Sequence, residues 1–161
     1  MKKWIIRLRY LAWGIAGVSL LWFLIALIWL KSPIGVHFAP DGSFDVFDTK
    51  LYGFYPHIIN AAIIGISALA ESLSHKIRTG MKITEQGEAM LSEIFCLTVA
   101  LGRLWLVLFF GYWNALVILQ KPLITIIPTA VILLEFLGFL VMLFALVIVR
   151  IHYGRKKGTD A

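Results

Sequence analysis

Cysteine is almost absent from this chain, and the single residue, Cys96, lies within an apolar run. One thiol cannot form an internal disulfide, a zinc cluster or a C-x-x-C redox pair. The motifs H-E-x-x-H and G-x-S-x-G and the P-loop are also missing, and no neighbouring base can be assigned to Cys96 or Ser67. The sequence therefore predicts no enzymatic activity and no cofactor, and it leaves the redox compartment open.

Polar surface is also scarce. Of 161 residues, 60% are hydrophobic and 14% aromatic, and the mean hydropathy is +0.88. This is too little polar surface to cover a soluble globule of this size, so the lipid bilayer is the expected solvent. The 15 Lys and Arg exceed the 9 Asp and Glu, but the basic residues cluster at the ends of apolar runs. That distribution indicates membrane topology and not nucleic-acid binding.

Four apolar segments are long enough to cross a bilayer, which takes about 20 helical residues for a core of about 30 Å. They cover residues 10–30, 51–73, about 94–115 and about 128–149. Helix pairs alone would lack a buried partner face, so we expect one domain over residues 1–161. The predicted fold class is an all-α integral membrane protein with four transmembrane helices. Residues 115–128 could finish the third span, form an outer surface segment or dip back into the membrane.

Basic residues predict the orientation, because Lys and Arg beside short loops stay in the cytoplasm. Only Lys31, Lys50 and Lys121 lie on one side. We therefore expect both termini in the cytoplasm, and the basic N-terminus to be the start of the first span and not a cleaved signal. Eleven basic residues lie on the other side: Lys2, Lys3, Arg7, Arg9, Lys76, Arg78, Lys82, Arg150, Arg155, Lys156 and Lys157.

A helix start is predicted within the loop between the second and third spans. Thr84 offers a capping hydroxyl, and Glu85 and Glu88 follow it. Acidic residues in a first turn are favoured by the helix dipole. The third helix should therefore begin there, before its apolar run.

Polar residues within the predicted second span share one helical face, since steps of three, seven and four residues separate them. They are His57, Asn60, Ser67 and Glu71. A second set at helical spacing forms a ridge of small residues, of the kind that lets membrane helices approach closely. The ridge consists of Ala61, Gly65, Ala68 and Ser72.

Arg103 and Glu135 are the costliest residues in the third and fourth spans, because a charge near mid-bilayer is opposed by about 2.5 to 3.5 kcal/mol. Counting residues from the span ends places the two within about 7 Å in depth. We expect an Arg103–Glu135 ion pair beside Asn60, with His57 above and Glu71 below. Two interpretations stay open: a structural pair that holds helices in register, or a proton or ion path.

The loop between the first two spans combines turn chemistry with acidic residues. Residues 39–43 have the x-P-D-G-x pattern of a turn, and the residues on both sides alternate, so a short β-hairpin is expected. Asp41, Asp45 and Asp48 with His37 could hold a cation, but the spacing is not that of an EF-hand, and no metal site is predicted. The alternative is turn capping, with Lys50 or Lys31 as a charge partner.

The same loop contains Pro33-Ile34-Gly35-Val36-His37-Phe38, Asp41-Gly42, Asp45 and Lys50, and Pro56 follows early in a helix. This motif resembles that of a family of small bacterial membrane proteins, domain-of-unknown-function family 1648. The module also forms the N-terminal part of SdpI-type immunity proteins, which protect cells against a membrane-active peptide toxin. The resemblance covers about the first half of the chain and implies a bacterial plasma membrane and an outward recognition loop.

Two functions are therefore expected from the sequence. The first is a binding or accessory protein whose outer loop (His37, Asp41, Asp45, Asp48 and Lys50) meets a peptide or a membrane-protein partner, with immunity as the concrete version. The second is a small transporter or channel subunit. Four helices are few for a pathway, so this function requires a homo-oligomer. It would use the intramembrane polar cluster of His57, Asn60, Glu71, Arg103 and Glu135.

Overall fold

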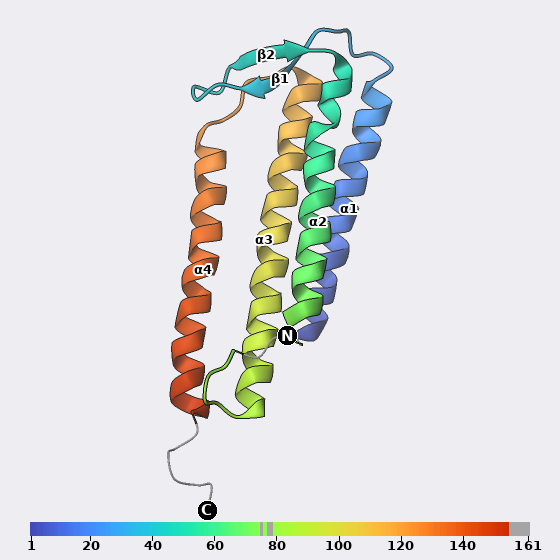
Figure 1. Ribbon diagram of the computed structural model, residues 1–161. Helices are drawn as coiled ribbons and strands as arrows, with labels where there is room; N and C mark the ends of the chain where they lie inside the picture. Colours follow the sequence, from blue (N-terminus) through green and yellow to red (C-terminus); the bar gives the residue numbers. More distant parts are fainter. Residues whose placement is uncertain (75, 77–78, 155–161) are drawn as a thin grey trace, which may run out of the picture.

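The computed structural model describes residues 1–74, 76 and 79–154. Four long helices run side by side, and a two-stranded hairpin covers one end of them (Figure 1). All four helices are long and apolar enough to cross a membrane, as predicted. The basic residues Arg78, Arg155, Lys156 and Lys157 lie outside the described residues. The elements are α1 (Lys2–Ala26), β1 (Ile34–Phe38), β2 (Phe44–Asp48), the 3-10 turn η1 (Lys50–Phe54), α2 (Tyr55–Ser74), α3 (Glu85–Leu119) and α4 (Ile126–Tyr153).

The helix α3 is the longest element and begins where the sequence predicts. The Thr84 side chain accepts a hydrogen bond from the Gly87 N–H at 3.3 Å, which caps the first turn. The helix then runs for 35 residues, roughly 52 Å, so it exceeds a hydrocarbon core of about 30 Å. It ends at Leu119, and the capping residue Gln120 has a left-handed φ of 48°.

The path of residues 115–128 is a helix end followed by a short connection. Residues 115–119 complete α3, and α4 begins at Ile126. The Gln120 side chain accepts a hydrogen bond from the Gly35 N–H at 2.8 Å, which joins the end of α3 to β1. The connection therefore lies at the hairpin end and does not re-enter the bundle.

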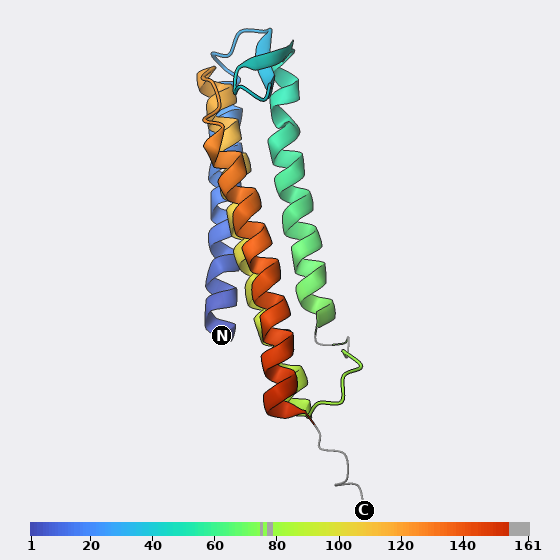
Figure 2. The same cartoon turned by 90° about the vertical axis from the view of Figure 1, so that its left-hand side faces the viewer.

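The helix α3 is central, since α1, α2 and α4 each pack against it, whereas α1 and α2 touch each other over a smaller area. The N-terminal end of α1 and the C-terminal end of α4 lie at the same end of the bundle, opposite the hairpin (Figures 1 and 2). This arrangement is the one expected for four antiparallel spans.

Most apolar side chains of α4 face outward, including Phe136 and Phe139, which are each 58% exposed. Exposing these large apolar groups to water would cost about 25 cal/mol for each Å² of apolar surface area. In lipid the same faces need no protein partner. The small-residue ridge on α2 also faces outward, because Gly65 has no atom within 4 Å of an added Cβ, and Ala61, Ala68 and Ser72 are exposed.

Candidate functional site

The hairpin is fixed to the bundle by its first strand. Ile34 and Phe38 of β1 are buried against Phe23 of α1 and Val117 of α3. In β2, by contrast, residues 45–47 are exposed. The hairpin is therefore not a free loop, and β2 is the strand that it presents to the surroundings.

The predicted turn is present at the tip of the hairpin. Gly42 has a φ of +88°, which L side chains rarely adopt. The Gly42 N–H donates to the Ala39 carbonyl at 2.9 Å, and the Leu123 N–H donates to the Gly42 carbonyl at 2.8 Å. The tip is thus hydrogen-bonded to the connection between α3 and α4.

The three aspartates of the loop do not form a joint cluster. Asp41 accepts hydrogen bonds from the hydroxyl and the N–H of Ser43, at 2.7 and 2.9 Å, and these bonds lower the pKa of its carboxyl. Asp48 accepts from the Thr49 N–H at 2.6 Å at the other end of β2. Among the described residues, no group of three His, Cys, Asp or Glu could hold a metal ion.

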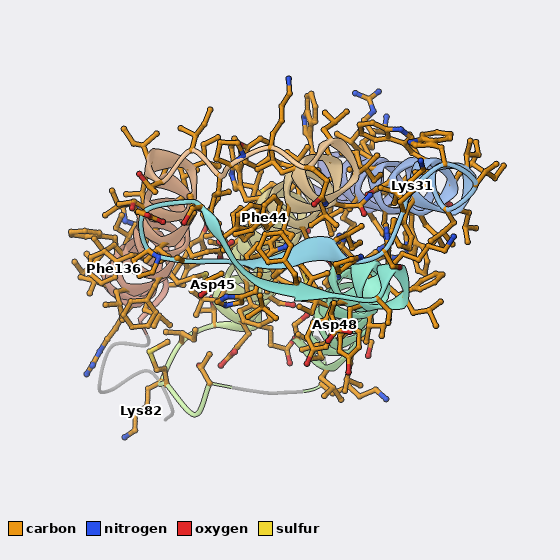
Figure 3. The ribbon with its side chains drawn as sticks, turned by 90° about the horizontal axis from the view of Figure 1, so that it is seen from above. Lys31, Phe44, Asp45, Asp48, Lys82 and Phe136 are labelled. Carbon is orange, nitrogen blue, oxygen red and sulfur yellow. The ribbon has the colours of Figure 1, made fainter. Side chains whose placement is uncertain are left out.

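Asp45 and Lys50 also have their own partners. Asp45 Oδ1 lies 2.7 Å from His37 Nδ1 across the hairpin. The expected lysine partner is wrong for Lys50, whose Nζ donates to the Leu27 carbonyl at 2.8 Å. Figure 3 shows Asp45 and Asp48 along β2, with Lys31 away from both. Turn capping and the His37 contact therefore account for the acidic residues.

A groove of about 400 Å³ lies between the hairpin and the adjoining ends of α2 and α3. Trp113 packs edge-on against Phe38, with ring centres 5.1 Å apart, and this contact joins α3 to the hairpin. The His37–Asp45 pair lies at the rim, since His37 also lines the groove. The lining residues are Val36, His37, Val46, Tyr52, Tyr55, Pro56, Ile59, Phe110 and Trp113.

Of the residues in this groove, sequence reasoning identified only His37 as a binding residue. A signal for the others was present, because Tyr52 and Tyr55 are three residues apart and so are Phe110 and Trp113, which puts each pair on one helical face. Aromatic residues at span ends are also typical of membrane anchors. The pattern alone therefore does not distinguish a groove from an anchor.

Inside the bundle, Glu71 lies between two arginines. Arg103 Nη1 is 2.9 Å from Glu71 Oε1, and both side chains are almost completely buried, at 0% and 4% exposure. Arg9 of α1 donates to Glu71 Oε2 and is 44% exposed. The three groups form a triad of two cations and one anion that joins α1, α2 and α3.

The predicted Arg103–Glu135 ion pair is wrong. Arg103 shares a face of α3 with Ala100 and Val107, which pack toward α1 and α2. Glu135 instead lies over Gly102, where an added Cβ would be 2.7 Å from Glu135 Oε2. Neighbouring helical residues point about 100° apart, so Gly102 faces α4 while Arg103 faces away from it.

A second set of buried polar groups lies nearer the hairpin. Asn60 is 2% exposed, and His57 packs against Phe23 with ring centres 5.3 Å apart. Sequence reasoning missed Asn114, whose Nδ2 donates to the carbonyl and the hydroxyl of Ser19 at 3.2 and 3.1 Å. Between this set and the triad lies a buried apolar layer of Ala12, Ile64 and Val107.

No protein-family model, curated protein or solved structure matches this chain.

Proposed function

We propose that this chain is a binding protein of the bacterial plasma membrane, with the hairpin outside the cell and both termini in the cytoplasm. Four helices of membrane-spanning length support the membrane location. The described basic residues support this orientation, since Lys2, Lys3, Arg7, Arg9, Lys76, Lys82 and Arg150 lie toward the helix ends opposite the hairpin. The partners on this proposal are the lipid bilayer and a ligand that approaches from outside.

The ligand that we propose is a membrane-active, amphipathic peptide with basic residues. The observation that carries this proposal is the aromatic groove, because Tyr52, Tyr55, Phe110 and Trp113 offer a concave apolar surface at the end of the helices. Aromatic groups are the side chains most often responsible for binding energy at protein interfaces. A buried apolar side chain of the peptide would occupy this groove.

Acidic residues beside the groove would attract the basic side chains of such a peptide. Asp45 belongs to the exposed strand β2 and keeps one carboxylate oxygen beyond its His37 contact. Asp48 is the last residue of this strand, and Asp41 lies in the turn that precedes it. The charges contribute mainly to the rate of association, whereas the groove contributes the affinity. A cell that captures the peptide at this surface would be protected from it, which is immunity.

The test combines survival with direct binding. Sensitive bacteria expressing the chain are challenged with a synthetic amphipathic Lys/Leu peptide, and its affinity is measured with the purified protein in lipid nanodiscs. Replacing Tyr52 and Tyr55 by Ala should weaken binding about tenfold, the loss expected for an aromatic contact of about 1.4 kcal/mol. The matched control replaces Phe136 and Phe139, which are equally exposed on α4. Equal affinities for the two double variants would contradict the proposal.

A small oligomeric transporter is the second candidate, favoured by the buried polar groups. The triad and the Asn60 and Asn114 groups lie on opposite sides of the Ala12, Ile64 and Val107 layer, so a pathway would have to open that layer. Proton flux into liposomes is the discriminating measurement. Flux that rises when Val107 is replaced by Ser would support this candidate, and no flux with the wild-type protein would exclude proton transport.

A further inference from the structure

The side chain of Glu135 lies in a cleft between α3 and α4. The cleft has a volume of about 240 Å³, and its other walls are mostly apolar. In the part of the chain that the structure describes, Glu135 forms no ion pair, and its buried Oε1 has no hydrogen-bond partner. The remaining lining residues are Thr98, Leu101, Gly102, Trp105, Leu134, Leu137, Gly138 and Val141.

Glycine at position 102 provides the space for the carboxylate. A Cβ there would lie 2.7 Å from Oε2 and 3.3 Å from Oε1, so any larger residue would displace the carboxylate. The acid follows Ile126 by nine positions, which places it roughly 14 Å along α4 from the hairpin end. At that depth a carboxylate is surrounded by hydrocarbon, where a charge without a partner is costly.

We propose that this cleft is the docking site for a transmembrane helix of another protein that carries a lysine or an arginine at the depth of Glu135. Charge complementarity identifies this occupant, because a basic side chain entering the cleft would pair with the carboxylate away from water. The outward face of α4 is available to receive the helix. In the described residues, α3 is the helix against which α4 packs extensively. This site is separate from the outer groove and does not depend on the peptide-binding function.

A second copy of the chain is a poorer occupant. Among the described residues, Arg103 and Arg9 both bind Glu71, and the other basic residues of the helices, Lys2, Lys3, Arg7 and Arg150, lie toward the helix ends opposite the hairpin, away from Glu135. Arg103 is also completely buried. A second copy would therefore have to break its own triad to supply a cation to this cleft.

The test uses the full chain in lipid nanodiscs with a donor dye, and a synthetic Leu/Ala transmembrane peptide with an acceptor dye. The peptide carries one Lys at the matched depth, and a second peptide carries Leu at that position. Energy transfer should show the Lys peptide associating about tenfold more strongly, the upper end for one interhelical polar contact in a membrane. Glu135→Gln should abolish the preference for the Lys peptide. The matched control Glu93→Gln, in the N-terminal part of α3, should retain it.

Three results would overturn the proposal: equal association of the Lys and Leu peptides with the wild-type chain, a Lys preference that survives Glu135→Gln, or a Glu135-dependent dimer of the chain itself. The last result would assign the cleft to a second copy. The comparison of the two peptides uses only the wild-type chain, so it does not depend on the folding of any variant. Glu135→Asp, which keeps the charge, should retain part of the preference.

Discussion

Arg103 and Glu71 form an ion pair, 2.9 Å apart, between the central helix α3 and its neighbour α2. Both side chains are buried, and Arg9 approaches the same carboxylate from α1. One acid therefore holds two bases from two other helices. The stability of the bundle should depend on the acid more than on either base.

Removing Glu71 should consequently destabilise the bundle more than removing Arg103. Glu71→Gln leaves the buried Arg103 guanidinium without an anion, a loss of about 3 to 5 kcal/mol. Arg103→Met leaves Glu71 bound to Arg9, so the loss should be nearer 1.5 to 3 kcal/mol, about the value of a hydrogen bond to a charged group. The free energy of unfolding in bicelles measures both, and equal losses would contradict the shared-acid arrangement.

Arg103 and Glu135 should be energetically independent. They lie on different sides of α3. Glu135 lies over Gly102 on the side of α4, whereas Arg103 forms its ion pair with Glu71 of α2. The double variant Arg103→Met with Glu135→Gln should therefore show additive losses within about 0.5 kcal/mol. A larger coupling energy in this double-mutant cycle would indicate a contact that the structure does not contain.

Gly102→Ala should displace the Glu135 carboxylate from its position over α3. The new Cβ would lie 2.7 Å from Glu135 Oε2, but the carboxylate is the end of a flexible side chain and can move, so the loss of stability should stay at or below the lower end of the about 1 to 3 kcal/mol that overpacking costs. The control is Gly65→Ala, where no atom lies within 4 Å of the added group, so stability there should be unchanged or slightly higher. Thermal unfolding of the two variants, followed by circular dichroism, gives the comparison.

The carboxyl of Asp41 should titrate below its ordinary pKa of 3.8 because it accepts two hydrogen bonds from Ser43. A lowered folded-state pKa stabilises the turn at pH values above 3.8, and this contribution is lost as the pH falls through the folded value. Ser43→Ala should raise the pKa toward 3.8. Carbon-13 NMR of the Asp41 carboxyl measures the change, and an identical titration in the variant would show that the Ser43 hydroxyl has no effect on this pKa.

Gly42→Ala should detach the hairpin tip from the connection between α3 and α4. The backbone at Gly42 has a φ of +88°, and a Cβ there would collide with the Leu123 carbonyl. Strain at such a position amounts to about 1 to 3 kcal/mol. Hydrogen exchange of the Leu123 amide, which donates to the Gly42 carbonyl, should become faster. Exchange of the Ile64 amide, far from the turn on α2, serves as the control.

The sequence was sufficient to predict the helices and the turn, because both depend on local chemistry. Run length predicted four spans, the Pro40-Asp41-Gly42 pattern predicted the hairpin, and Thr84 marked the start of α3. Residue counting was wrong for Asn60, which was expected beside Arg103 with Glu71 below, because Arg103 pairs with Glu71 and Asn60 lies beyond the Ile64 layer. The partner of Arg103 could not be obtained in this way, since depth does not specify the direction in which a side chain points from its helix.

Arg9 and the groove were missed for related reasons. Arg9 lies at the edge of an apolar run, where a basic residue is expected for topology, yet α1 begins at Lys2 and carries Arg9 two turns into the helix. The groove forms only where the hairpin folds over α2 and α3, so Trp113 and Tyr55 meet across segments distant in the sequence. Neither arrangement is encoded in a local pattern.

The central position of α3 has a consequence for how the chain is made. The first two spans leave the ribosome before α3, touch each other only over a small area, and hold Glu71 against Arg9 alone. Their buried faces are completed only when α3 enters between them with Arg103. We therefore expect α1 and α2 to stay near the insertion machinery until the third span is synthesised, and a chain arrested earlier to be recognised by membrane quality control.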